Sequence, residues 1–152
     1  MFQERLSTCS NLTKRGIIMI SEFCPLCNDT FESENHVFLS CQITSPLLID
    51  FCNWWGASIS GPTSLHALHS WGSSLGLKGN KLTGFRTAVY ALCWCIWKFR
   101  NSKVFQRPYH CSLDIIGESE SLAFFWLNSR GKLGRKLNWV NWISSHLDAI
   151  PV

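Results

Sequence analysis

Residues 24–41 read CPLCNDTFESENHVFLSC, and this stretch decides the fold of the N-terminal part of the chain. It contains two cysteines separated by two residues, a histidine after eight more residues, and a third cysteine after a further four. Three thiolates and one imidazole are a normal ligand set for tetrahedral zinc. The sequence therefore predicts one zinc ion bound by Cys24, Cys27, His36 and Cys41.

The residues between these ligands suit such a site. Pro25 favours the tight turn between the first two cysteines. Ser33 is expected to cap a short helix that contains His36. Five positions correspond to about 140° around an α-helix, so this helix must end near Ser40 if Cys41 is to face the metal. Four protein ligands leave no open coordination position, which predicts structural rather than catalytic zinc. The alternative is that these four side chains are ordinary core residues.

The rest of the chain predicts a mainly α fold, with a small zinc-knuckle module followed by a helical segment. A short helix should follow Thr8 and stop at Gly16. A second should have Ser45 as its cap, Pro46 in its first turn and Gly56 after its end. The expected division is 1–56 for the zinc-binding module, 57–80 for a Ser- and Gly-rich linker or loop, and 81–152 for a helical basic region.

Three helices are expected in that last region, near 81–105, near 112–128 and from residue 139 onward. Apolar residues recur at helical spacing in the first of them. The face predicted to be apolar in the last helix comprises Trp139, Trp142, Ile143, His146, Leu147 and Ile150. Cysteines without ligand spacing are predicted to be small core residues, namely Cys9, Cys52, Cys93, Cys95 and Cys111.

Charge is distributed unevenly along the chain. Residues 1–77 have a formal charge of −3, and residues 78–152 have +7. A basic half suits a polyanionic partner such as RNA or single-stranded DNA, since aromatic residues lie among its cations. The alternative is a solvated helix end whose cations complement the helix dipole. The candidate phosphate contacts are Lys98, Arg100, Lys103 and Arg107, and a second basic cluster comprises Arg130, Lys132, Arg135 and Lys136.

Other classes of protein are disfavoured by the sequence. The N-terminus has no apolar run behind a basic start, and the longest apolar stretch, 87–97, is too short to span a bilayer. We therefore expect an intracellular protein, in nucleus or cytoplasm, without membrane association. Residues 72–76 match G-x-S-x-G, but the strand and the α/β sheet that a nucleophilic serine requires are not predicted. We expect no enzymatic activity.

Several segments together resemble a known family. They are 5–8 (Arg-Leu-Ser-Thr), 11–12 (Asn-Leu), 15–17 (Arg-Gly-Ile), the four metal ligands and the acidic run 31–36. This pattern is similar to the zinc-binding domain that follows the reverse transcriptase in plant non-LTR (LINE-type) retrotransposons. Residues 95–105 resemble a segment often found downstream in such proteins. Ser7 departs from the family, which usually has Pro there.

The resemblance implies a structural-zinc, nucleic-acid-associated module from a retrotransposon polyprotein, with a reverse transcriptase domain as a possible partner. It does not imply polymerisation by this chain, which lacks the adjacent aspartates that a polymerase requires. Two alternatives stay open: a zinc-stabilised protein–protein interaction fragment, and a remnant with no selected function.

Overall fold

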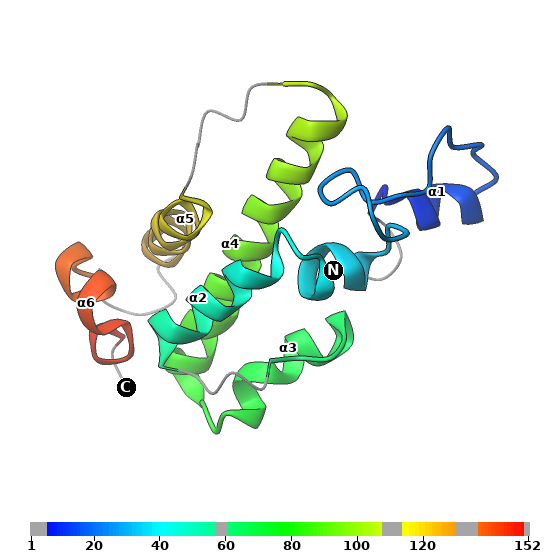
Figure 1. The fold of residues 1–152 in the computed structure, drawn as a ribbon. Coiled ribbons are helices and arrows are strands. Elements are labelled where there is room, and N and C mark those ends of the chain that lie inside the picture. The colour runs from blue at the N-terminus through cyan, green and yellow to red at the C-terminus, as the bar shows by residue number, and fades with distance from the viewer. Residues whose placement is uncertain (1–5, 57–60, 108–113, 130–136, 151–152) are drawn as a thin grey trace.

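The computed structural model describes residues 6–56, 61–107, 114–129 and 137–150. Within these ranges the chain is mainly helical, as predicted, and its elements are arranged around one long helix (Figure 1). No strand occurs in the described ranges, where the pairing of Phe23 with Phe31 is an isolated antiparallel bridge. The Cys/His segment precedes the helical segment, in the predicted order.

The first helix, α1, spans Cys9–Lys14 and begins and ends as expected. The Thr8 side chain accepts a hydrogen bond from the backbone N–H of Asn11, which caps the helix. Gly16 follows with φ of +78°, a left-handed conformation that glycine adopts without steric cost. The predicted metal-binding segment, residues 24–41, comes next and contains a π-helical turn, η1, at His36–Ser40.

Helix α2 spans Ser45–Trp55 and ends at the predicted Gly56, which has φ of +58°. The prediction that Ser45 caps this helix is wrong, because the N-cap position belongs to Thr44. The Thr44 side chain does not cap either, since its hydroxyl donates to the carbonyl oxygen of Val37 at 2.6 Å. The start of α2 is therefore joined to the π-helical turn.

Helix α3 spans Leu65–Ser74 and lies inside the segment 57–80 that was expected to be a linker or loop. That expectation is wrong for these ten residues. The Ser64 side chain caps the helix by accepting the N–H of Ala67, and Leu68 and Trp71 are buried. Gly72 serves close packing here, because a Cβ at this position would lie 2.8 Å from Leu82 Cδ1.

Helices α4 and α5 form the centre of the helical segment. The long α4 spans Gly79–Val104, and α5 spans Ile115–Ser129 and packs against it (Figure 1). Both agree with the helices expected from the sequence. The basic cluster at 130–136 lies outside the described residues, as does Cys111.

The last helix, α6, spans Trp139–Ala149 and contains non-helical dihedral angles at Ser145. Of its predicted apolar face, Trp142, His146 and Ile150 are buried, whereas Trp139 is exposed. The indole N–H of Trp142 donates to the backbone carbonyl of Glu120 at 3.1 Å, which ties α6 to α5.

The hydrophobic core is continuous from the metal-binding segment to α6. At its centre, the ring of Phe51 lies about 6 Å from those of Trp55, Trp71 and Phe85, which belong to three helices. Cys9, Cys52, Cys93 and Cys95 are buried, as predicted. None of the helices in the described ranges has the length and apolarity needed to cross a lipid bilayer.

Candidate metal centre

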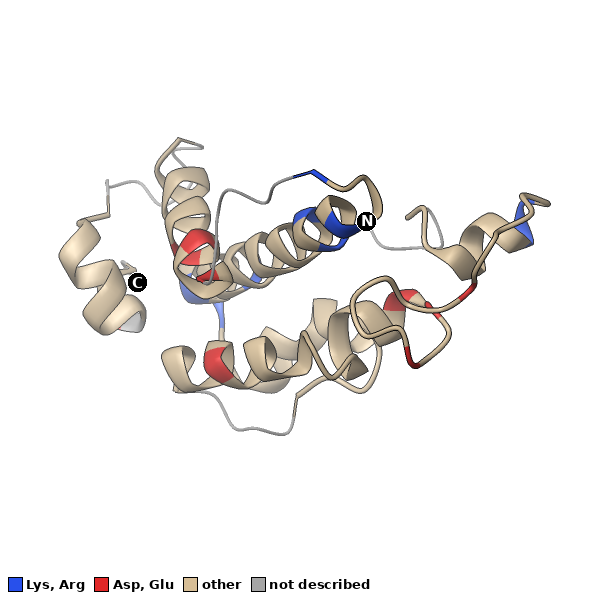
Figure 2. Cartoon of the chain, turned by 45° about the horizontal axis from the view of Figure 1, so that its top comes forward, with Lys and Arg blue, Asp and Glu red and all other residues tan. Residues whose placement is uncertain are grey.

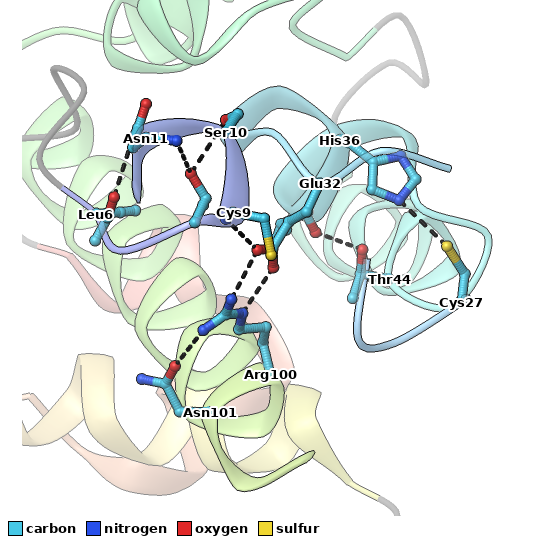
Figure 3. Close-up of polar contacts among 12 residues, drawn as sticks. Leu6, Cys9, Ser10, Asn11, Cys27, Glu32, His36, Thr44, Arg100 and Asn101 are labelled. Atoms are coloured by element: carbon cyan, nitrogen blue, oxygen red, sulfur yellow. Dashed lines mark hydrogen bonds and ion pairs between the residues drawn. The ribbon is translucent and has the colours of Figure 1, made fainter. Parts of the chain in front are cut away.

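The four predicted ligands converge in space. One potential ligand atom from each of Cys24, Cys27, His36 and Cys41 lies within 4.8 Å of the corresponding atoms of the other three. Cys27 Sγ is 3.4 Å from His36 Nε2 (Figure 3). A tetrahedron with metal–sulfur bonds of roughly 2.3 Å has edges of roughly 3.8 Å, so this donor set fits one zinc ion.

The first ligand pair is held by a tight knuckle. Cys24 donates its backbone N–H to Thr30 at 2.8 Å, and its carbonyl accepts the N–H of Asn28 at the same distance. Asn28 has φ of +53°, a left-handed conformation that asparagine tolerates better than most residues. These bonds reverse the chain, so that Cys24 and Cys27 face the same point.

The second ligand pair is held by the π-helical turn. The Ser33 hydroxyl accepts the backbone N–H of His36 at 3.1 Å, as its predicted capping role requires. Cys41 then donates its N–H to the carbonyl of His36 at 2.7 Å. This bond spans five residues, the pattern of a π-helix, and places Cys41 about one turn above His36. The helix ends at Ser40 as expected, but by π-helical winding.

Burial and hydrogen bonding affect the thiols differently. Burial raises the pKa of the Cys24 thiol to about 12. Partial burial also acts to raise the pKa of Cys27, but backbone hydrogen bonds from Asp29 and Thr30 and the contact with His36 lower it to about 6. Cys27 is therefore better prepared as a thiolate than Cys24, whose proton zinc binding must displace.

The site is largely closed to solvent. Cys24, His36 and Cys41 are buried, and Cys27 is half-buried. With four protein ligands, zinc here keeps no position for a substrate or a reactive water. The arrangement therefore suits a structural zinc ion, whose binding free energy contributes directly to folding.

Arg100 was predicted to contact phosphate, but the structure does not leave it available. It is 4% exposed and pairs with Glu32 through two hydrogen bonds of 2.7 Å (Figure 3). A guanidinium enclosed in this way cannot reach a nucleic acid. Sequence reasoning missed Glu32 as a partner, because no local pattern indicates a contact across 68 positions.

The other three candidate phosphate contacts differ in their surroundings. Lys98 forms an ion pair of 2.6 Å with Glu118 of α5. Lys103 and Arg107 are exposed at the C-terminal end of α4, where Figure 2 shows basic positions close together. The Lys103 ammonium lies 5.6 Å from the ring centroid of Phe99, and the Arg107 guanidinium lies 5.9 Å from that of Phe105.

Comparison with known proteins concerns the N-terminal third of the chain. No curated protein and no solved structure matches the chain. Residues 1–47 match the family model described as zinc-binding in reverse transcriptase, and all four converging ligands lie within this match. The more specific origin in a plant LINE-type element stays a prediction. Over residues 1–47, the chain therefore matches the zinc-binding domain of reverse transcriptases.

Proposed function

We propose that this chain is a zinc-stabilised module that associates with RNA or single-stranded DNA and catalyses no reaction itself. We also propose a retrotransposon origin for the chain and a reverse transcriptase domain as its protein partner. Its support is the closed Cys/His cluster inside a segment that matches a reverse-transcriptase zinc-binding domain. A closed structural zinc site stabilises the protein surface around it, and nucleic acid would bind at such a surface.

The end of α4 is the surface we assign to this contact. Lys103 and Arg107 are exposed there, and the Phe105 side chain between them is 62% exposed. Cations supply phosphate contacts, and an exposed aromatic ring can stack on any base. Such contacts carry little sequence information, so we expect sequence-tolerant binding. Because Arg100 is buried and Lys98 forms an ion pair with Glu118, we assign the phosphate contacts to Lys103 and Arg107.

A binding experiment with matched variants tests this surface. We expect Lys103→Ala/Arg107→Ala to weaken binding of unstructured RNA and DNA oligonucleotides, and to reduce the salt slope by roughly 0.7 per lost phosphate contact. The control, Lys78→Ala/Lys81→Ala, removes the same charge at the other end of α4. Equal affinities and equal salt slopes in the two double variants would contradict the assigned surface.

A second candidate function is protein–protein interaction, and exposed apolar residues in the chain between α1 and η1 favour it. Ile18 is 96% exposed, and the exposed rings of Phe23 and Phe31 stack at 5.1 Å. Binding through such a surface would be almost independent of salt, whereas phosphate-driven binding weakens steeply as salt rises. The salt dependence of any partner that is found distinguishes the two functions.

A further inference from the structure

The carboxylate of Glu32 and the guanidinium of Arg100 form a buried ion pair between the metal-binding segment and α4. Nε of Arg100 lies 2.7 Å from Oε1 of Glu32, and Nη2 lies 2.7 Å from Oε2. The Arg100 side chain is 5% exposed, and the Glu32 side chain is 0% exposed. The backbone N–H of Cys9 also donates to Oε2 at 2.7 Å. One carboxylate thus joins α1, the metal-binding segment and α4.

Glu32 lies between the backbone groups that organise the two ligand pairs. Two residues before it, Thr30 accepts the N–H of Cys24, and directly after it, Ser33 caps the turn that begins with His36. The Glu32 backbone is also held in place, since its N–H donates to the backbone carbonyl oxygen of Glu22 at 2.9 Å. A displacement of Glu32 would therefore move both halves of the metal site.

The same face of α4 also contacts the π-helical turn itself. Phe38, which lies between the ligands His36 and Cys41, is 2% exposed, and its ring centroid is 6.4 Å from that of Trp97. The Arg100 guanidinium lies 4.9 Å from the Trp97 ring centroid, and it donates a further hydrogen bond to Asn101 (Figure 3). Trp97 and Arg100 are three residues apart, so one helical face supports both parts of the site.

We propose that Arg100 is a positioning residue for the zinc site, and that α4 around residues 97–101 belongs to the zinc-binding unit although it lies far beyond the matched segment 1–47. Arg100 acts through Glu32, which holds the chain between the two ligand pairs. The proposal rests on zinc binding by the four ligands and is independent of nucleic-acid binding. By linkage, whatever Arg100 contributes to zinc affinity, zinc contributes equally to the formation of the Glu32–Arg100 pair.

A double-mutant cycle for zinc affinity tests the proposal in the full chain. The proteins are the parent, Glu32→Gln, Arg100→Met and the double variant, and zinc dissociation constants are measured by competition with a chelator at fixed pH. We expect each single variant to bind zinc about tenfold more weakly or worse, because it leaves a buried charge without its partner. The double variant should lose less than the product of the two single effects, since no unpaired charge remains.

Two further variants separate positioning from general destabilisation. Leu127→Ala empties part of the core on α5, and should lower the unfolding temperature of the zinc-loaded protein at least as much as Arg100→Met does while weakening zinc binding less. Arg100→Lys keeps the charge without the two-pronged geometry, so its zinc affinity should fall between those of the parent and Arg100→Met. If a single variant does not fold, Arg100→Lys and the double variant still report on the pair. Parental zinc affinity in Arg100→Met, or in both Arg100→Lys and the double variant, would overturn the proposal.

Discussion

Cys41 donates its backbone N–H to the carbonyl oxygen of His36, five residues earlier, over 2.7 Å. This bond replaces the four-residue bond of an α-helix and brings two ligands to one side of the turn. Because the π-helical pattern changes which N–H groups bond which carbonyls, a neighbouring carbonyl group needs another hydrogen-bond donor. Thr44 supplies it for Val37, whose carbonyl accepts the Thr44 hydroxyl in a fully buried position.

Replacing Thr44 by Val should therefore destabilise the protein. The two side chains have the same shape, but valine leaves the buried Val37 carbonyl without its donor, at a cost of about 1–3 kcal/mol. Chemical denaturation of the zinc-loaded protein measures the change. The control is Thr83→Val, which removes a 3.2 Å bond to Gly79 at an exposed position and should change stability by less than about 0.5 kcal/mol. Equal unfolding midpoints for the two variants would contradict this role of Thr44.

Gly84 of α4 should be intolerant of alanine because of Ile150. A Cβ on Gly84 would lie 2.2 Å from Ile150 Cδ1, and Ile150 is buried. Alanine normally stabilises a helix interior by about 1 kcal/mol relative to glycine. We nevertheless expect Gly84→Ala to lower the free energy of unfolding, because the buried Ile150 side chain must shift to make room for the added methyl group.

The sign of the Gly84 effect should depend on residue 150. In an Ile150→Ala background, the space opposite Gly84 is open, so Gly84→Ala should become neutral or stabilising. Urea denaturation of the four proteins in this cycle measures the interaction. A stabilising effect of Gly84→Ala in the parent background would show that Ile150 does not press on α4.

His146 should make stability fall in mild acid. Burial lowers the pKa of its imidazole, opposed by the Trp55 backbone and the Asp148 carboxylate, and its ring lies 4.2 Å from that of Trp55. The unfolded state, with a pKa near 6.5, therefore takes up a proton before the folded state does. The stability that depends on neutral His146 is complete above this pH and is lost as pH falls below it.

Comparison with His146→Leu isolates this contribution. The parent should lose more free energy of unfolding than the variant between about pH 7.5 and 5.5, with zinc in excess. The zinc ligands are common to both proteins, so their effect cancels in the difference. Glu120 is also common to both; burial raises the pKa of its carboxyl to about 7, and its contribution has the opposite sign. An identical pH dependence in parent and variant would contradict a buried, neutral His146.

The zinc site was predictable because its information is local. All four ligands lie within residues 24–41, and their residue types and spacing are those of known structural sites. The caps at Thr8 and Gly56 were predictable for the same reason, since each depends on dihedral angles and bonds a few residues away. Sequence also indicated that the helix after Ser33 must fray or end near Ser40, but not that it would end as a π-helical turn.

Features that depend on distant contacts were missed. The Ser and Gly residues of 57–80 suggested a loop. Helix α3 forms there because Leu68 and Trp71 are buried, and because Gly72, which has no Cβ, lets α4 pack close to it. Arg100 looked like a surface cation because charged residues are usually exposed. Its partner Glu32 lies 68 positions away, and only the folded chain brings the two together.

The zinc content of the purified full chain is the most direct test of a structural metal site. The parent should contain about one equivalent of zinc, and Cys41→Ser should lose it together with helical circular-dichroism signal. The matched control is Cys52→Ser, a buried cysteine outside the cluster, which should keep the metal. A parent protein that is free of zinc and retains the same circular-dichroism spectrum would contradict the account.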